Sequence, residues 1–146
     1  MADDVSPERL GKSLEVLHFA FRGLIAEPDS ILKTHALSRI HHRLLFFINR
    51  YSGLSVNELV ETMRLTKQAI HKPLKLLVTE GYVGVARDVS DKRVKRLTLT
   101  DKGNELEHKL TGIQYQLMNE AFLSVGPQGT DAWFSVMDTM ARRLGL

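Results

Sequence analysis

Basic and amide side chains gather on one side of the segment that follows Thr66. They are Lys67, Gln68, His71, Lys72 and Lys75. In a helix, which turns by about 100° per residue, these side chains fall within roughly 140° of arc, opposite most apolar side chains of the segment. Ammonium groups neutralise phosphates or donate to guanine, and a glutamine amide pairs with adenine. The pattern predicts a helix that reads a DNA major groove; the alternative is an ordinary solvated face.

A second group of charged residues surrounds a short polar turn further along the chain. Its members are Arg87, Asp91, Lys92, Arg93 and Lys95. Arg93 is long enough to enter a minor groove, where narrow A·T tracts concentrate negative potential. Asp91 is an unexpected residue beside a polyanion, so we expect its carboxylate to accept turn N–H groups or to orient Arg93. A generic surface turn is the simpler alternative.

The positive charge of the chain is concentrated in this region. Residues 66–96 contain eight bases and three acids, a net charge of +5, whereas the whole chain of 146 residues carries +3. The remainder is therefore net acidic, which favours a localised surface for a polyanion over a uniformly basic protein.

Local capping signals place these side chains on defined elements. Ser55-Val-Asn-Glu58 is a capping box that opens a short helix, and Thr66 caps the next helix, which ends at Gly81. Residues 82–85 and 94–99 are predicted to be strands on either side of the polar turn. Two helices followed by a basic hairpin indicate a winged helix-turn-helix domain over residues 37–100. Free N–H groups at a helix start favour phosphate, and Ser55 and Thr66 are included among the expected DNA contacts.

Long amphipathic helices are predicted on both sides of this domain. The first begins at Ser6-Pro7 and is expected to stop at Glu27-Pro28, and the second begins after Thr100 and is expected to break at Gly126-Pro127. Their apolar residues exceed what the central domain can cover, so residues 7–27 and 101–146 are expected to pair with a second copy as one intertwined unit. The predicted fold class is mainly α with a small β-hairpin wing: a winged helix-turn-helix with long N- and C-terminal dimerisation helices.

Four short motifs lie between Leu54 and Gly103. They are Leu54-Ser-Val-Asn-Glu-Leu-Val60, Gly81-Tyr-Val83, Asp91-Lys-Arg93 and Leu99-Thr-Asp-Lys-Gly103. Together they resemble the opening helix, the junction into the wing, the Asp-x-Arg wing signature and the exit into the fifth helix of the MarR family of bacterial transcription regulators. The resemblance implies a homodimer, most simply a repressor, that binds a pseudo-palindromic operator; many such proteins release DNA when a small molecule binds.

Three features depart from that family pattern. Val85 and Ala86 stand where the first wing strand often carries an arginine pair, so minor-groove contact is expected to depend on the bases of the polar turn. Pro73 lies inside the predicted recognition helix, removes one backbone N–H and is expected to bend or loosen that helix. The chain has no cysteine, which excludes the peroxide-sensing branch that uses a reactive thiol.

The histidines and their neighbours allow two further hypotheses. His18, Phe21, Arg22 and His41 are candidates to line a ligand cleft between the first two helices and the fifth, although helix packing with polar edges is the simpler interpretation. A metal-responsive regulator is an alternative, but the adjacent His41 and His42 point about 100° apart on a helix and cannot easily share one ion. We therefore expect neither a metal nor a cofactor.

Other classes of protein are less consistent with the sequence. There is no nucleophile elbow, phosphate loop, HExxH motif or pair of carboxylates in an apolar setting, so we expect no enzyme. A winged helix can also serve protein–protein contact, but such a module should lack the basic recognition face. The longest apolar run, 44–48, is too short to span a membrane. The expectation is a cytoplasmic protein without membrane contact, whose partners are double-stranded DNA and a second copy, with a small-molecule effector as a further candidate.

Overall fold

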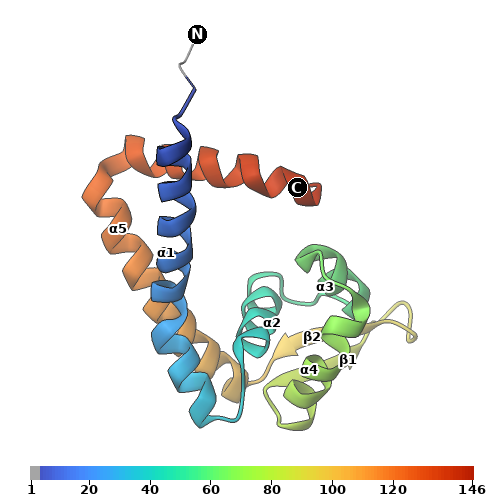
Figure 1. Cartoon of the computed structure of the whole chain (residues 1–146). Coiled ribbons are helices and arrows are strands. Elements are labelled where there is room, and N and C mark those ends of the chain that lie inside the picture. Colours follow the sequence, from blue (N-terminus) through green and yellow to red (C-terminus); the bar gives the residue numbers. More distant parts are fainter. Residues whose placement is uncertain (1–3) are drawn as a thin grey trace.

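Five α-helices and one β-hairpin form the described part of the chain, residues 4–146, in this computed structural model. The elements are α1 (Pro7–Thr34), α2 (Arg39–Arg50), α3 (Val56–Met63), α4 (Lys67–Thr79), β1 (Val83–Arg87), β2 (Lys95–Leu99), α5 (Asp101–Ala141) and a final 3₁₀ turn (Arg142–Leu144). Figure 1 shows α1 and α5 side by side, extending away from the group that α2, α3, α4 and the hairpin form. This architecture confirms the predicted fold class.

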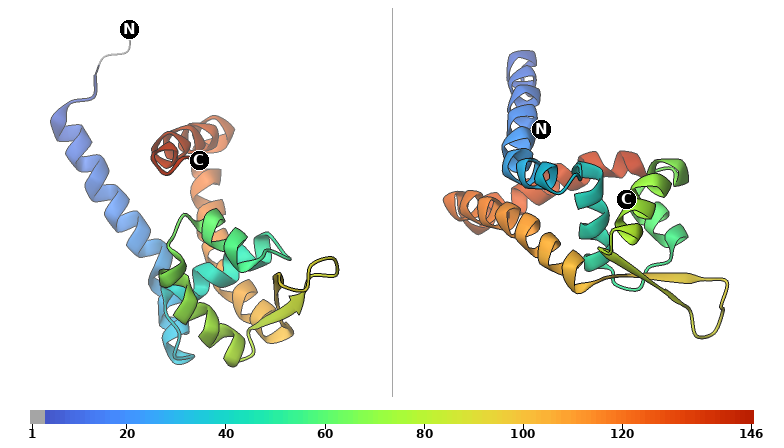
Figure 2. Two further views of the ribbon diagram at one scale, coloured as in Figure 1. Left: turned by 90° about the vertical axis from the view of Figure 1, so that its right-hand side faces the viewer. Right: turned by 90° about the horizontal axis from the view of Figure 1, so that it is seen from below.

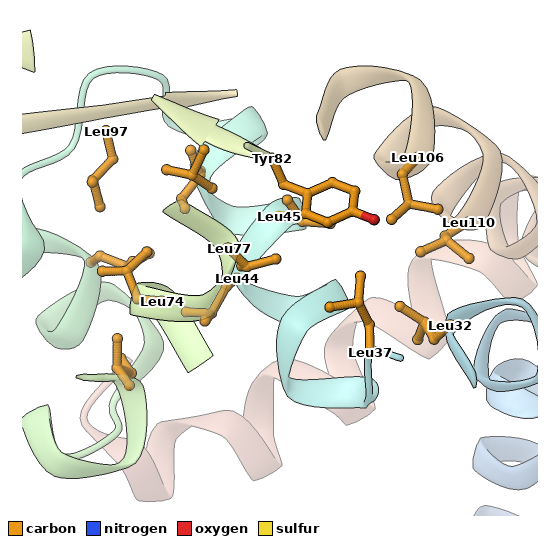
Figure 3. Close-up of a cluster of buried hydrophobic side chains, with 14 residues drawn as sticks. Leu32, Leu37, Leu44, Leu45, Leu74, Leu77, Tyr82, Leu97, Leu106 and Leu110 are labelled. Atoms are coloured by element: carbon orange, nitrogen blue, oxygen red, sulfur yellow. The ribbon is translucent and has the colours of Figure 1, made fainter. Parts of the chain in front are cut away.

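An apolar cluster joins the helices to the hairpin. Its fully buried members are Leu32, Leu44, Leu45, Ile48, Leu59, Ile70, Leu77, Leu97 and Leu110. Three of them come from α2, which packs against α4, β2 and α5 and is therefore the central helix. Figure 3 shows Tyr82, just before β1, with its ring directed toward Leu106 of α5. The same core thus positions both the helix-turn-helix and the start of the wing.

The first helix continues past the point where the sequence predicted its end. α1 runs to Thr34, and Pro28 lies inside it with its ring buried. Because proline has no N–H, the Leu24 carbonyl loses its usual partner within the helix, but Gln114 Nε2 of α5 donates to that carbonyl at 3.3 Å. The predicted stop at Glu27-Pro28 was wrong, since the acceptor left free in α1 is satisfied by another helix.

The two helices of the helix-turn-helix begin where their capping residues indicate. Ser55 Oγ accepts the Glu58 N–H at 3.1 Å, and Thr66 Oγ1 accepts the Ala69 N–H at 3.1 Å. The second half of the predicted capping box was wrong, because the Glu58 carboxylate pairs with Arg96 of β2 rather than with its own helix start.

The hairpin is fixed to the chain that precedes α3. β1 and β2 pair antiparallel with Val83 opposite Leu99, within two residues of the predicted bounds. On the other edge of β2, the Gly53 N–H donates to the Leu97 carbonyl at 3.1 Å, and the Leu97 N–H donates to the Leu54 carbonyl at 2.8 Å. The base of the wing is therefore anchored by backbone bonds, while its turn projects outward (Figure 2).

The fifth helix changes direction at Gly126, which confirms the predicted break at Gly126-Pro127. The backbone there has φ 73° and ψ −177°, a conformation that glycine reaches without a clash of Cβ. Figures 1 and 2 show the final segment leaving the end of the first part of α5 at a steep angle. This segment and α1 leave large apolar side chains exposed in one chain: Leu10, Leu14, Leu17, Phe21, Phe134, Val136 and Met140.

Candidate nucleic-acid interface

The two sides of α4 differ as the sequence predicted. Ile70, Leu74 and Leu77 are buried in the core, and Pro73 is half-buried within a helix that continues through it to Thr79. All five side chains of the predicted groove-reading face are exposed: Lys67, Gln68, His71, Lys72 and Lys75. The three ammonium groups, the amide and the imidazole are therefore free to meet an external surface.

A groove of about 490 Å³ lies between α4 and the hairpin. Lys67, Lys75 and Lys95 line it together with the partly exposed valines Val78 and Val85. Ammonium groups beside aliphatic side chains can contact phosphates and a thymine methyl at the same time. The groove therefore joins a strand of the wing to the helix that carries the predicted base contacts.

The turn of the wing is organised by Asp88. Its Oδ2 accepts the Ser90 hydroxyl at 2.7 Å, the Ser90 N–H at 3.1 Å and the Asp91 N–H at 3.0 Å, and its Oδ1 accepts Arg96 Nε at 3.2 Å. The hydrogen bonds from Ser90, Asp91 and Arg96 lower the pKa of Asp88 to about 2. The carboxylate is therefore ionised at neutral pH and accepts all four of these hydrogen bonds.

Arg93 is bonded to Asp91 through both its backbone and its guanidinium, yet its side chain is exposed. Asp91 Oδ1 accepts the Arg93 N–H at 3.0 Å and Arg93 Nε at 3.1 Å, while Asp91 Oδ2 accepts Nη2 at 3.3 Å. These bonds from Arg93 lower the pKa of Asp91. The Arg93 side chain remains 92% exposed. The hydrogen bonds expected of Asp91 are therefore present, to the backbone N–H of the turn and to the guanidinium of Arg93.

The remaining predicted contacts fall into separate groups. Ser55, Arg93 and Lys95 together line a hollow of about 190 Å³ between the start of α3 and the wing. Arg87 and Lys92 are exposed on the turn, where Arg87 Nη1 donates to the Lys92 carbonyl at 3.4 Å. Gln68 and Lys72 line neither this hollow nor the groove, and Thr66 is engaged as the cap of α4.

Arg96 is a residue of this region whose role the sequence did not reveal. Its Nη1 donates to Glu58 Oε1 at 3.0 Å and to the Gly53 carbonyl at 3.3 Å, in addition to the bond from Nε to Asp88. It contributes to the positive charge of residues 66–96, yet two carboxylates neutralise it within the protein. The charge left for an external partner is correspondingly smaller than the sequence suggests.

A second hollow, of about 200 Å³, lies between α1, α2 and α5. Its lining residues are Phe21, Leu24, Ile25, Arg39, His42, Arg43, Phe46 and Gln114. Of the four residues predicted for a ligand cleft, Phe21 lies here, whereas His18 and Arg22 do not line this hollow. His41 is used at the start of α2, where its Nδ1 accepts the Ser38 N–H at 2.9 Å.

His42 is the histidine that lines this hollow. The sequence suggested it only as a candidate metal ligand. Its Nε2 lies 3.1 Å from Thr111 Oγ1 of α5, and burial lowers the pKa of His42 below its ordinary value of 6.5. The imidazole is therefore neutral at physiological pH and links α2 to α5. Arg39, at the same hollow, pairs with Asp29 at 2.9 Å.

Within residues 4–146 no group of three or more His, Cys, Asp or Glu side chains is placed to hold a metal ion. None of the helices in this part of the chain is long and apolar enough to span a bilayer.

Comparison with known proteins gives consistent matches. The model of the MarR family matches residues 36–94. The HTH-type transcriptional regulator PetP of Rhodobacter capsulatus is 38% identical over 136 residues, covering 93% of this chain and 82% of PetP. Among solved structures, Staphylococcus aureus MarR in complex with salicylate and kanamycin has a TM-score of 0.71 at 21% identity, covering 94% of this chain and 93% of the other. A Staphylococcus aureus MepR–DNA complex has a TM-score of 0.73 at 15% identity, covering 88% and 94%.

Proposed function

Because the chain belongs to the MarR family of transcriptional regulators, we propose that it is a ligand-responsive repressor that binds a pseudo-palindromic operator as a homodimer. Residues 37–100 form the DNA-binding unit in this proposal, and residues 7–27 and 101–146 form the dimerisation region. The observation that carries the proposal is the exposed basic and amide face of α4 beside a basic wing.

The roles of the side chains follow from where they lie. α4 enters the major groove, where Gln68 and His71 face base edges and the lysines of α4 contact phosphate or guanine. Arg93 extends from the turn into the adjacent minor groove. In a two-fold symmetric dimer this arrangement is repeated, which requires two half-sites related by the same symmetry.

Selection of bound duplexes from a random pool tests the proposal directly. We expect the selected sequences to contain inverted half-sites whose centres lie about one helical turn, or a multiple of it, apart. A selected pool without any enriched sequence, or with a single unrepeated half-site, would refute the proposed operator.

The effector is proposed to be a small aromatic carboxylate. The hollow between α1, α2 and α5 offers the rings of Phe21 and Phe46 together with the guanidinium groups of Arg39 and Arg43, and the Staphylococcus aureus relative was solved with salicylate. Salicylate is expected to release the selected duplex, and Arg43→Gln to raise the concentration needed by about tenfold through loss of one charge-assisted bond. Identical titration curves for wild type and Arg43→Gln would place the effector elsewhere.

The wing makes a separate prediction. Arg93→Ala is expected to weaken DNA binding and to lower the salt slope by about one unit for each wing that reaches the duplex, most strongly for A·T-rich flanks. Asp91→Ala should also weaken binding, by about threefold to tenfold, although it removes a negative charge near DNA, because three bonds to Arg93 are lost.

Dissociation constants over a range of salt measure both effects. Arg9→Ala, the same change at an exposed arginine in the first turn of α1, serves as the control and should leave the slope unaltered. Tighter binding by Asp91→Ala would refute the orienting role, because simple charge arithmetic would then account for the result.

A further inference from the structure

Arg96 connects three parts of the chain that are distant in sequence. It lies on β2 opposite Ala86 of β1. Its guanidinium donates to Asp88 at 3.2 Å, to Glu58 at 3.0 Å and to the Gly53 carbonyl at 3.3 Å. One side chain therefore joins the wing turn, the first helix of the helix-turn-helix and the loop that precedes it.

These bonds leave Arg96 poorly suited to contact DNA itself. Its side chain is 36% exposed, compared with 92% for Arg93. Its Nε and Nη1 both donate to carboxylates of the same chain, which neutralise the positive charge that would attract a phosphate. Arg93 is also paired, but with a single carboxylate, and its side chain is almost fully exposed.

The bond to Asp88 leads to the tip of the wing through a continuous series of contacts. Asp88 accepts the N–H of Asp91, and Asp91 in turn holds the backbone and the guanidinium of Arg93. At the other end, Glu58 lies in α3, which packs against α4. The position of Arg93 is thus linked to the helix pair by Arg96.

We infer that Arg96 is a positioning residue for DNA binding: its bonds to Glu58 and Asp88 set the angle between the wing and the helix-turn-helix, so that Arg93 and α4 meet the same duplex. The inference rests on the proposed DNA-binding function. The base of the wing keeps its backbone bonds between Leu97 and residues 53 and 54 without this side chain. Loss of Arg96 should therefore release the turn and leave the fold intact.

Arg96→Met and Lys95→Met test this difference on neighbouring residues of one strand. Both remove one positive charge, but Lys95 is exposed and Arg96 is paired. On a duplex selected by the wild-type protein, Arg96→Met is expected to raise the dissociation constant about tenfold with an unchanged salt slope. Lys95→Met is expected to lower the slope by about one unit for each subunit in contact.

A double variant separates positioning from general loss of stability. If Arg96 acts through the wing, Arg96→Met should change the affinity by less than about twofold when Arg93 is already alanine. A variant that merely destabilises the protein should weaken binding by the same factor in both backgrounds. Amide exchange over residues 88–94 should become faster in Arg96→Met, while exchange in α2 and α5 remains as in the wild type.

Each other result overturns the inference in a recognisable way. A lower salt slope for Arg96→Met would make Arg96 a phosphate contact, and equal losses in the two backgrounds would make it a stability residue. If Arg96→Met does not fold, Glu58→Gln removes the α3 end of the connection and keeps the backbone N–H that Ser55 caps, and the same two comparisons apply. Failure of the wild-type protein to select any duplex would instead refute the proposed function and this inference with it.

Discussion

Leu14→Glu is expected to convert the proposed dimer into a folded monomer of 16.5 kDa. Leu14 is 70% exposed within one chain, on the side of α1 that also carries Leu10, Leu17 and Phe21, so the change removes little packing from the subunit. In a symmetric pair, the substitution would place two carboxylates where two leucines are buried in the interface. We expect this to reduce the free energy of dimerisation by about 4 kcal/mol or more. The dissociation constant of the dimer should therefore rise by at least about a thousandfold.

Sedimentation velocity over a range of concentrations measures this effect, and circular dichroism checks the fold. Lys12→Glu is the matched control, because it introduces the same acid at an exposed position roughly 160° away around α1. A Leu14→Glu variant that still sediments as a dimer would exclude this side of α1 from the interface. A wild-type monomer at micromolar concentration would refute the proposed dimer altogether.

Gly103→Ala is expected to destabilise the protein by about 3 kcal/mol and to lower its melting temperature by roughly 10 °C. Gly103 is buried in the first turn of α5, and a Cβ there would lie 1.9 Å from the Tyr82 carbonyl oxygen. That oxygen already accepts the Thr100 N–H at 3.1 Å. The methyl group can be accommodated only if α5 moves away from the junction of α4 and β1.

Gly112→Ala provides the control on the same helix. Gly112 is exposed, and a Cβ there would meet no atom within 4 Å, so alanine should raise the stability by about 0.5–1 kcal/mol through helix propensity. Thermal unfolding of both variants at one protein concentration gives the comparison. Equal stability of Gly103→Ala and the wild type would show that the start of α5 is not held against Tyr82.

The local signals of the sequence predicted the starts of α3 and α4, the turn of the wing and the two sides of α4. The caps at Ser55 and Thr66, the left-handed glycine at Gly81 and the Asp91–Arg93 turn each act over a few residues, so their effects could be predicted from spacing alone. The separation of buried and exposed side chains on α4 likewise follows from one helical period.

The errors and omissions concern bonds between distant segments. α1 continues through Pro28 because Gln114 donates to the Leu24 carbonyl that the proline leaves free. The two residues are 90 positions apart in the sequence, so no local pattern could reveal this bond. The role of Arg96 was missed because its partners Glu58 and Gly53 are 38 and 43 residues away along the chain. The prediction placed His41 in the hollow, whereas the structure places His42 there. This error has the same origin, because the rotation of α2 against α5 decides which histidine faces the hollow. No periodicity within one segment carries this information.

The buried Pro28 has a consequence for the distance between the two DNA-reading units of a dimer. Because Pro28 has no N–H, the Leu24 carbonyl lacks its usual donor within α1. Gln114, at the facing position of α5, donates to this carbonyl instead. Sliding α5 by one helical turn, about 5.4 Å, would leave both groups without this partner in a half-buried setting. The bond between Gln114 and Leu24 therefore favours one register of α5 against α1, and in the proposed dimer this register contributes to the separation of the two DNA-binding units.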